Sequence, residues 1–198
     1  MVSPAVWGPP TWEFFHTLSV KIREQNFKIL GPIVLNFIKR ICSNLPCPEC
    51  SQHATNFFIT NSKTVIDKKE KLIALLYIFH NKVNVRKKKD PFLYENMKIY
   101  QDKNLVDVYN NFIRVYNYKG NLNQINESFH RDRIIFDLKK FLMANVIHFT
   151  PLPKPTPTPA PITITITQEP SKTEEEPEKV ESSTLNTNSS SDVIQINI

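Results

Sequence analysis

Apolar residues recur at helical spacing through the first 100 residues of this 198-residue chain, and glycine and proline interrupt the pattern. Gly8-Pro9-Pro10 predicts a helix start, and Gly31-Pro32 predicts the end of that helix and the start of a second. Pro48 predicts the start of a third helix. Asp67-x-x-Glu70 has the form of a capping box and predicts a fourth, apolar nearly all round. Four helices with short joints favour an all-α fold, an up-and-down four-helix bundle.

The rest of the chain falls into two further regions. Residues 101–149 show helical periodicity twice, with Gly120-Asn121 as the predicted turn between two additional helices. From residue 150 the sequence alternates proline with small residues and then becomes acidic and rich in Ser, Thr and Asn, which indicates a disordered tail. The predicted divisions are therefore a helical domain over 1–100, a further helical region over 101–149 and a tail over 150–198.

Composition narrows the classes of function. The net charge is +6, and because the segment from Phe149 onward carries three lysines against seven acidic residues, the residues before it carry +10. Such a basic region makes nucleic-acid binding an alternative, but charge alone is weak support and the aromatic residues lie in predicted helices, so we expect no nucleic-acid partner. Only three glycines occur, which excludes the glycine-rich dinucleotide and phosphate loops. Neither a membrane span nor a secretory leader is predicted, so we expect a cytoplasmic protein.

Two of the three cysteines, Cys47 and Cys50, carry the clearest chemical signal. If Pro48 begins a helix, Cys47 is its N-cap, where free backbone N–H groups and the helix dipole stabilise a thiolate. Cys50 lies one turn further and can form a disulfide with Cys47, which is a redox geometry. Two alternatives stay open: a pair of structural thiols, and a zinc site made of Cys42, Cys47, Cys50 and His53, for which the usual second ligand pair is missing. A thioredoxin-type domain is disfavoured because no βαβ unit precedes the pair.

The segment WGPPTWEFFH, residues 7–16, combines aromatic and imidazole side chains. Trp12 and His16 are four residues apart and therefore share a helix face. A flat conjugated ring suits such a surface. Packing in a hydrophobic core is the alternative, and it is the commoner role of aromatic residues.

A second segment, HNKVNVRKKKDPF, spans residues 80–92. His80 and Asn84 lie one helical turn apart, and the basic run Arg86–Lys89 follows them. Such a run can neutralise a diphosphate without a glycine loop. The alternative is a solvated basic helix end that stabilises the helix dipole.

In order and spacing, these segments resemble the Erv/ALR family of FAD-linked sulfhydryl oxidases, and in particular its short members from large DNA viruses. The family pattern is W-G-x-x-x-W-x-x-x-H, then C-x-x-C, then H-N-x-V-N-x-x-x-x-K-x-x-F, and the resemblance covers residues 7 to about 95. The matching residues are Trp7, Gly8, Trp12, His16, Cys47, Cys50, His80, Asn81, Val83, Asn84, Lys89 and Phe92.

The resemblance implies an FAD-binding four-helix bundle that forms disulfide bonds in partner proteins. Electrons would pass from a dithiol to the CxxC pair, to FAD and to oxygen, with hydrogen peroxide as the product. Cys50 would face the flavin and supply a charge-transfer thiolate, and Cys47 would exchange with the substrate. No metal ligand is implied. The implied cofactor-binding residues are Trp7, Gly8, Trp12, His16, His53, Phe57, His80, Asn81, Val83, Asn84, Lys89 and Phe92.

The sequence departs from the family in three places. The usual L-G-K-P run reads Lys87-Lys88-Lys89-Asp90, and both the second structural cysteine pair and the shuttle pair of many relatives are absent. Electrons would therefore enter Cys47 directly from a separate, thioredoxin-like dithiol protein. The family also implies a homodimer, and a viral origin would place the protein in the host cytosol or the virion. The alternative to an enzyme is a helical zinc-binding or interaction module.

Overall fold

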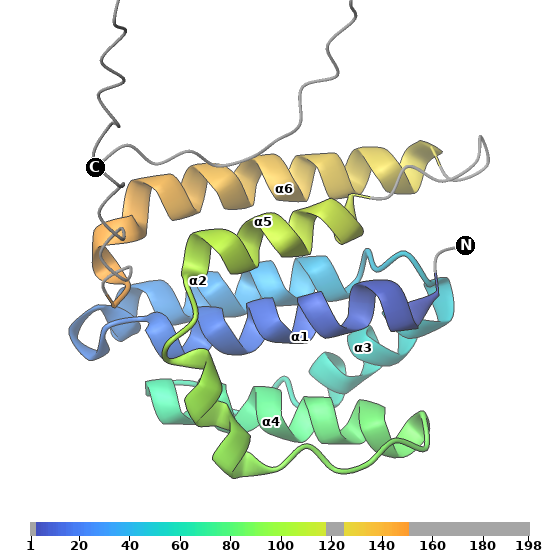
Figure 1. Ribbon diagram of the computed structural model, residues 1–198, viewed down its shortest axis with the longest axis horizontal. Helices are drawn as coiled ribbons and strands as arrows, with labels where there is room; N and C mark the ends of the chain where they lie inside the picture. The colour runs from blue at the N-terminus through green and yellow to red at the C-terminus, as the bar shows by residue number, and fades with distance from the viewer. Residues whose placement is uncertain (1–2, 118–124, 151–198) are drawn as a thin grey trace, which may run out of the picture. The chain divides into compact units, whose positions relative to one another are not determined.

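The computed structural model describes residues 3–117 and 125–150, and within these ranges it forms six α-helices and two short 3₁₀-helices (Figure 1). The predicted all-α class is confirmed for this part of the chain. The predicted turn at Gly120-Asn121 and the predicted tail lie outside the described residues. The elements are α1 (Pro4–Lys21), α2 (Glu24–Cys42), α3 (Pro48–Thr60), α4 (Lys69–Arg86), η1 (Tyr94–Tyr100), α5 (Leu105–Tyr116), α6 (Ile125–Asn145) and η3 (Val146–His148).

The joint between α1 and α2 lies at Ile22, and the predicted joint at Gly31-Pro32 is wrong. Ile22 has an extended backbone and forms an isolated antiparallel bridge with Phe149. Beside this bridge, the Thr150 N–H donates to the carbonyl of Lys21 at 2.7 Å. The residues at which α1 stops are thus paired with residues 149 and 150, far away in the sequence, and no local sequence signal could predict that contact.

Helix α2 continues through Gly31-Pro32 because this glycine serves packing. A Cβ at Gly31 would come within 2.6 Å of the Phe27 ring, so only glycine lets this ring lie against the helix. Phe27, Val34 and Ile38 are buried along the same helix. Burial of this apolar face outweighs the hydrogen bond that Pro32 removes.

The predicted start of α1 near Gly8 is wrong, whereas α4 starts one residue later than the capping-box pattern predicts. Helix α1 begins at Pro4, one turn before Gly8, and the Ser3 hydroxyl accepts from the Ala5 N–H at 3.3 Å. Helix α4 begins at Lys69 with no side-chain cap, because the Asp67 carboxylate pairs with Lys71 Nζ at 2.7 Å. The capping-box pattern is thus present in the sequence but does not form the reciprocal hydrogen bonds.

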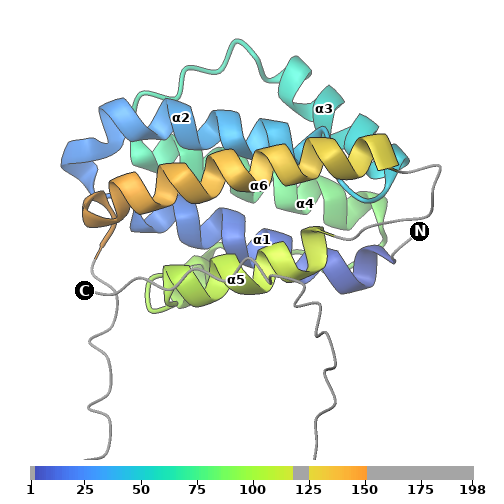
Figure 2. The same ribbon diagram turned by 90° about the horizontal axis from the view of Figure 1, so that it is seen from above.

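One hydrophobic cluster joins the helices on both sides of residue 100. Helix α5 lies alongside α1 in both ribbon views (Figure 1, Figure 2), and the rings of Phe14 and Phe112 stack at 4.6 Å and 10° between them. Helix α6 contacts α2 through Phe37 and Phe141, whose ring centroids are 5.2 Å apart. The packing is continuous across the predicted domain boundary, and the boundary itself stays a prediction.

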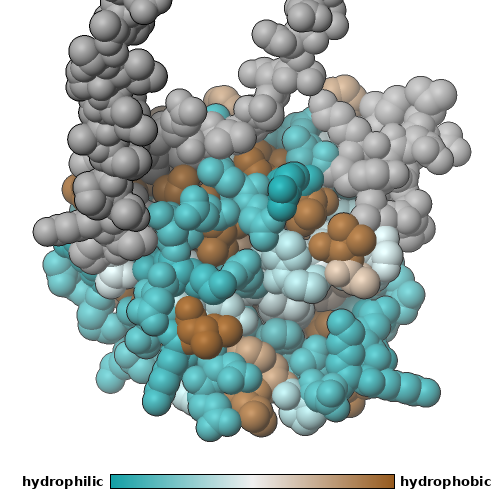
Figure 3. All heavy atoms as spheres, viewed as in Figure 1, coloured by the Kyte–Doolittle hydropathy of each residue, from teal (hydrophilic) through white to brown (hydrophobic). Residues whose placement is uncertain are grey.

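Polar side chains cover most of the face seen in Figure 3, where hydrophobic residues form small separate groups. Among the described residues, no helix has the length and apolarity needed to cross a bilayer.

Helix α4 ends in a Schellman motif around Lys88, which has a φ of 52°. The Lys88 N–H donates to the Val85 carbonyl at 3.1 Å, and the Lys89 N–H donates to the Asn84 carbonyl at 2.9 Å. Helices commonly place glycine at this left-handed position, because a Cβ is strained there. This is the position at which the L-G-K-P pattern has its glycine.

We expect Lys88→Gly to stabilise the protein. Relief of the left-handed strain, about 1–2 kcal/mol, exceeds the entropy cost of glycine, about 0.5–1 kcal/mol, so the free energy of unfolding should rise by roughly 0.5–1 kcal/mol. Urea unfolding measures this difference. Lys87→Gly is the matched control, because Lys87 has a φ of −90°. A stabilisation by the control as large as that by Lys88→Gly would contradict the explanation.

Candidate active site

Cys47 and Cys50 form a disulfide at the start of α3. The predicted helix start at Pro48 is confirmed, and Cys47 is the N-cap, whose Sγ accepts from the Cys50 N–H at 3.2 Å. Each cysteine is 7% exposed, and both belong to the main hydrophobic cluster. The sulfur atoms are thus largely buried at the N-terminus of α3, where the Cys50 N–H and the helix dipole stabilise a thiolate at Cys47.

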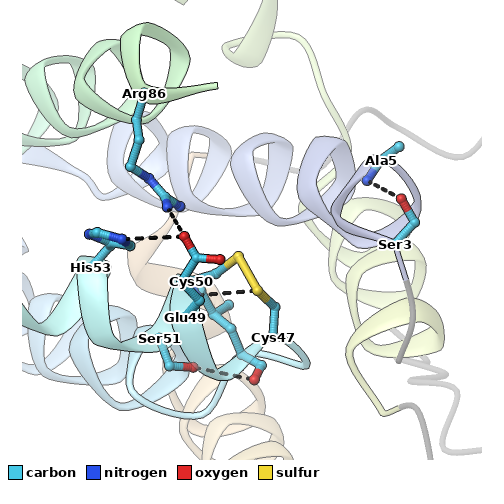
Figure 4. Close-up of a disulfide and its surroundings, with 9 residues drawn as sticks. Ser3, Ala5, Cys47, Glu49, Cys50, Ser51, His53 and Arg86 are labelled. Carbon is cyan, nitrogen blue, oxygen red and sulfur yellow. Dashed lines mark hydrogen bonds and ion pairs between the residues drawn. A yellow bond between two sulfur atoms is a disulfide. The ribbon is translucent and has the colours of Figure 1, made fainter. Parts of the chain in front are cut away.

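Glu49, between the two cysteines, connects α3 to the end of α4 (Figure 4). Its Oε1 accepts from Arg86 Nη1 at 2.8 Å and lies 3.5 Å from His53 Nε2. His53 is therefore directed toward this carboxylate, with nearly half of its side chain exposed. The sequence offers no local signal for this arrangement, because Glu49 and Arg86 are 37 residues apart.

A stack of flat side chains lies between α1 and α4. The ring of His80 stacks against Trp12, with centroids 4.1 Å apart and an interplanar angle of 11°, and against Phe92 at 4.6 Å and 21°. His16 stacks against Phe92 at 5.2 Å and 15°, and against Tyr100 at 5.0 Å and 26°. Four of the predicted site residues thus come together from three segments of the chain, and Tyr100 joins them although no motif includes it.

The two histidines of the stack are joined by a hydrogen bond between His16 Nε2 and His80 Nδ1, at 3.0 Å. Burial, and to a lesser degree the neighbouring His80, lowers the pKa of His16 to about 3. Burial, followed by the charge of Lys89, lowers the pKa of His80 to about 4. Both imidazoles are therefore neutral at pH 7, so one donates to the other and each keeps a polar nitrogen for another partner.

Two asparagines of α4 hold the loop that follows the helix. Asn81 makes a reciprocal pair with Phe92, accepting from its N–H at 2.8 Å and donating to its carbonyl at 3.0 Å. Asn84 Nδ2 donates to the Asp90 carbonyl at 3.1 Å. These bonds place Phe92 on the stack. In this structure the two asparagines position the loop rather than present free amides.

The remaining predicted residues lie at different distances from the stack. Phe57 reaches it through Phe79, which stacks on Phe57 at 4.6 Å and contacts Trp12 at 5.1 Å. The sequence interpretation missed Phe79, although it precedes His80 directly. Trp7 is buried in the main hydrophobic cluster, and Val83 packs against this cluster. A Cβ added at Gly8 would meet no other atom within 4 Å, and Lys89 is exposed.

Unpartnered polar atoms indicate what the site can hold. Trp7 Nε1, His16 Nδ1 and Arg86 Nε are buried and make no hydrogen bond. Each such atom costs about 1–3 kcal/mol if it stays unsatisfied. A flat heteroaromatic group with polar edges, carrying anionic groups toward the basic end of α4, would supply both ring stacking and hydrogen-bond partners. The residues present therefore fit a nucleotide-type cofactor.

The zinc alternative required Cys42, Cys47, Cys50 and His53 to converge. In the part of the chain that the structure describes, no group of three or more His, Cys, Asp or Glu side chains could hold a metal ion. Cys42 is 1% exposed in the core, where burial raises the pKa of its thiol. Cys42 is thus a free buried thiol, and no observation on the described residues favours the zinc alternative.

Comparisons with known proteins agree with the three motifs. Residues 9–103 match the Erv1 / Alr family. A protein of Invertebrate iridescent virus 3 named "Putative FAD-linked sulfhydryl oxidase 096R" is 28% identical over 86 residues, which are 43% of this chain and 58% of that protein. Its counterpart named "Putative FAD-linked sulfhydryl oxidase 347L", of Invertebrate iridescent virus 6, is 28% identical over 91 residues, 43% of this chain and 82% of that protein. No solved structure matches. The predicted resemblance to this family and its viral members is confirmed.

The neutral histidine pair predicts a specific pH dependence of stability. An unfolded histidine has a pKa of about 6.5, so the unfolded state binds more protons than the folded state between pH 6.5 and about 4. The free energy of unfolding therefore falls as the pH is lowered through this window. Between pH 7 and pH 5, the free energy of unfolding of His16→Phe should therefore fall by about 1–2 kcal/mol less than that of the wild type. Urea unfolding of the ligand-free protein at both pH values measures this, with exposed His130→Gln as control. An unchanged loss in His16→Phe would contradict the assignment.

Burial also predicts which cysteines react. After reduction of the folded protein, iodoacetamide should modify Cys47 and Cys50, which are each 7% exposed at the N-terminus of α3, and it should modify Cys42 only after denaturation, since Cys42 is 1% exposed and burial raises the pKa of its thiol. Mass spectrometry counts the adducts. Three adducts on the folded wild type, formed at equal rates, would show that Cys42 is more accessible than its burial indicates.

Proposed function

We propose, from the match of residues 9–103 to the Erv1 / Alr family, that the protein is an FAD-linked thiol oxidase with Cys47–Cys50 as its redox-active disulfide. The observation that supports this most directly is the position of the disulfide. It occupies the start of α3, and its sulfur atoms belong to the same hydrophobic cluster against which Trp12 packs. One ring of the stack, Trp12, is therefore packed against the hydrophobic cluster that contains the disulfide.

The thiol exchange begins at Cys47. A thiolate of the substrate attacks Cys47 Sγ, the Cys47–Cys50 bond breaks, and the bonding pair leaves with Cys50 as a thiolate. The second substrate thiolate then attacks the mixed disulfide, forms the substrate's own disulfide and releases Cys47 as a thiolate. The N-cap N–H groups and the dipole of α3 stabilise this leaving group. The substrate has lost two electrons, and the cysteine pair has gained them.

The stack between α1 and α4 would hold FAD. Trp12, His80 and Phe92 stack on one another with His80 in the middle, so a flat ring would pack at the ends of this stack, and His16 Nδ1 and Trp7 Nε1 are buried polar atoms that lack partners. Lys87 to Lys89 lie at the end of α4 and would face the diphosphate. Bound there, FAD would supply the redox chemistry that carries the electron pair from the reduced cysteines to oxygen, with hydrogen peroxide as the product.

The thiol substrate belongs to the same proposal. Within the sequence, Cys42 is a free buried thiol. Electrons would come from a separate protein with two neighbouring thiols, of thioredoxin-like type. The family resemblance also leads us to propose a homodimer and a cytosolic or virion location.

Two measurements on the full chain test the function. The purified protein should show visible flavin absorbance that bleaches with dithiothreitol and returns while oxygen is consumed. Cys50→Ser should lower thiol-dependent oxygen consumption on the order of 10²-fold or more, since the cysteines act as a unit, and Cys42→Ala should retain it. A colourless wild type, or full turnover by Cys50→Ser, would refute the proposal.

A further inference from the structure

Glu49 and Arg86 hold two opposite charges beside the disulfide (Figure 4). Glu49 is the second residue of α3, and Arg86 is the last residue of α4. Their side chains meet at 2.8 Å, and they are 67% and 27% exposed respectively. His53, one turn along α3, has its Nε2 3.5 Å from the same carboxylate oxygen. None of the three motifs accounts for this ion pair, and it joins two helices that both contribute to the site.

The redox state of the cysteines changes the charge next to this pair. Reduction of the Cys47–Cys50 bond takes up two electrons and up to two protons. The thiol at the N-cap loses its proton most readily, so the reduced state is more negative than the disulfide. A nearby guanidinium therefore stabilises the reduced state, and a nearby carboxylate destabilises it.

We propose that Glu49 and Arg86 are positioning residues that set the reduction potential of the Cys47–Cys50 couple with opposite signs. Glu49 makes the couple more reducing, and it also holds the Arg86 guanidinium over the start of α3. Arg86 makes the couple more oxidising. This effect on the reduction potential of the cysteines does not depend on the proposed function. Its consequence rests on the proposed function, because the potential determines whether electrons pass from a substrate dithiol to the cysteines.

Glu49→Gln and Arg86→Gln separate the two contributions. Each removes one charge, and glutamine at position 49 can still accept a hydrogen bond from Arg86. The full chain is equilibrated without oxygen in dithiothreitol or glutathione redox buffers and trapped by alkylation, and mass spectrometry counts the modified cysteines. Glu49→Gln should shift the equilibrium constant at least threefold toward the reduced form, and Arg86→Gln at least threefold toward the disulfide. A threefold shift corresponds to about 14 mV for a two-electron couple.

Several controls distinguish charge from structure. Arg86→Lys keeps the charge and should stay within twofold of the wild type, and the double variant should return close to it. Asp67→Asn breaks a comparable ion pair at the opposite end of α4 and should shift nothing. At about 1 M salt, where the screening length is about 3 Å, the shifts of the single variants should shrink.

Shifts in the same direction, or no shift in either single variant, overturn the inference. If a glutamine variant does not fold, Glu49→Ala and Arg86→Met make the same charge changes with different side chains and test the same signs. The titration reads the cysteines directly and needs no turnover. A colourless protein without oxidase activity would therefore refute the proposed function, while the signs of the shifts would still decide the role of the ion pair.

Discussion

The hydrogen bond between His16 and His80 is the interaction on which the arrangement of the site depends. It joins α1 to α4 at 3.0 Å, and it can form only while both imidazoles are neutral or share one proton. Burial keeps them neutral, because an imidazolium inside this stack would lose its hydration. Neutral rings in turn stack closely against Trp12 and Phe92. Electrostatics and ring packing thus favour the same geometry.

Local sequence signals predicted the parts of the site that depend on neighbouring residues. Pro48 after Cys47 predicted an N-cap cysteine, because proline has no N–H to lose in a first turn. The four-residue spacing of Trp12 and His16 predicted a shared helix face, and the two rings stack at 5.9 Å. Here the helix geometry alone brings the side chains together, so the pattern is sufficient.

Contacts between distant segments could not be predicted in the same way. Ile22 at the stop of α1 pairs with Phe149, and Glu49 of α3 pairs with Arg86 of α4, and the residues of each pair are far apart in the sequence. Gly31 was interpreted as a break because glycine usually weakens a helix, whereas its role is to admit the Phe27 ring. In each case tertiary packing outweighed a correct local preference.

The second half of α4 connects both chemical parts of the site. His80 belongs to the ring stack, Phe79 packs on Phe57 of α3, and Arg86 reaches Glu49 beside the disulfide. A movement of α3 that displaced the cysteines would therefore also disturb Phe79, and through it Trp12. Since closely packed side chains resist small displacements, helix α4 keeps the disulfide and the ring stack at a fixed distance and orientation relative to each other. In the proposed reaction, dithiol exchange at the start of α3 would therefore leave the rings between α1 and α4 in place.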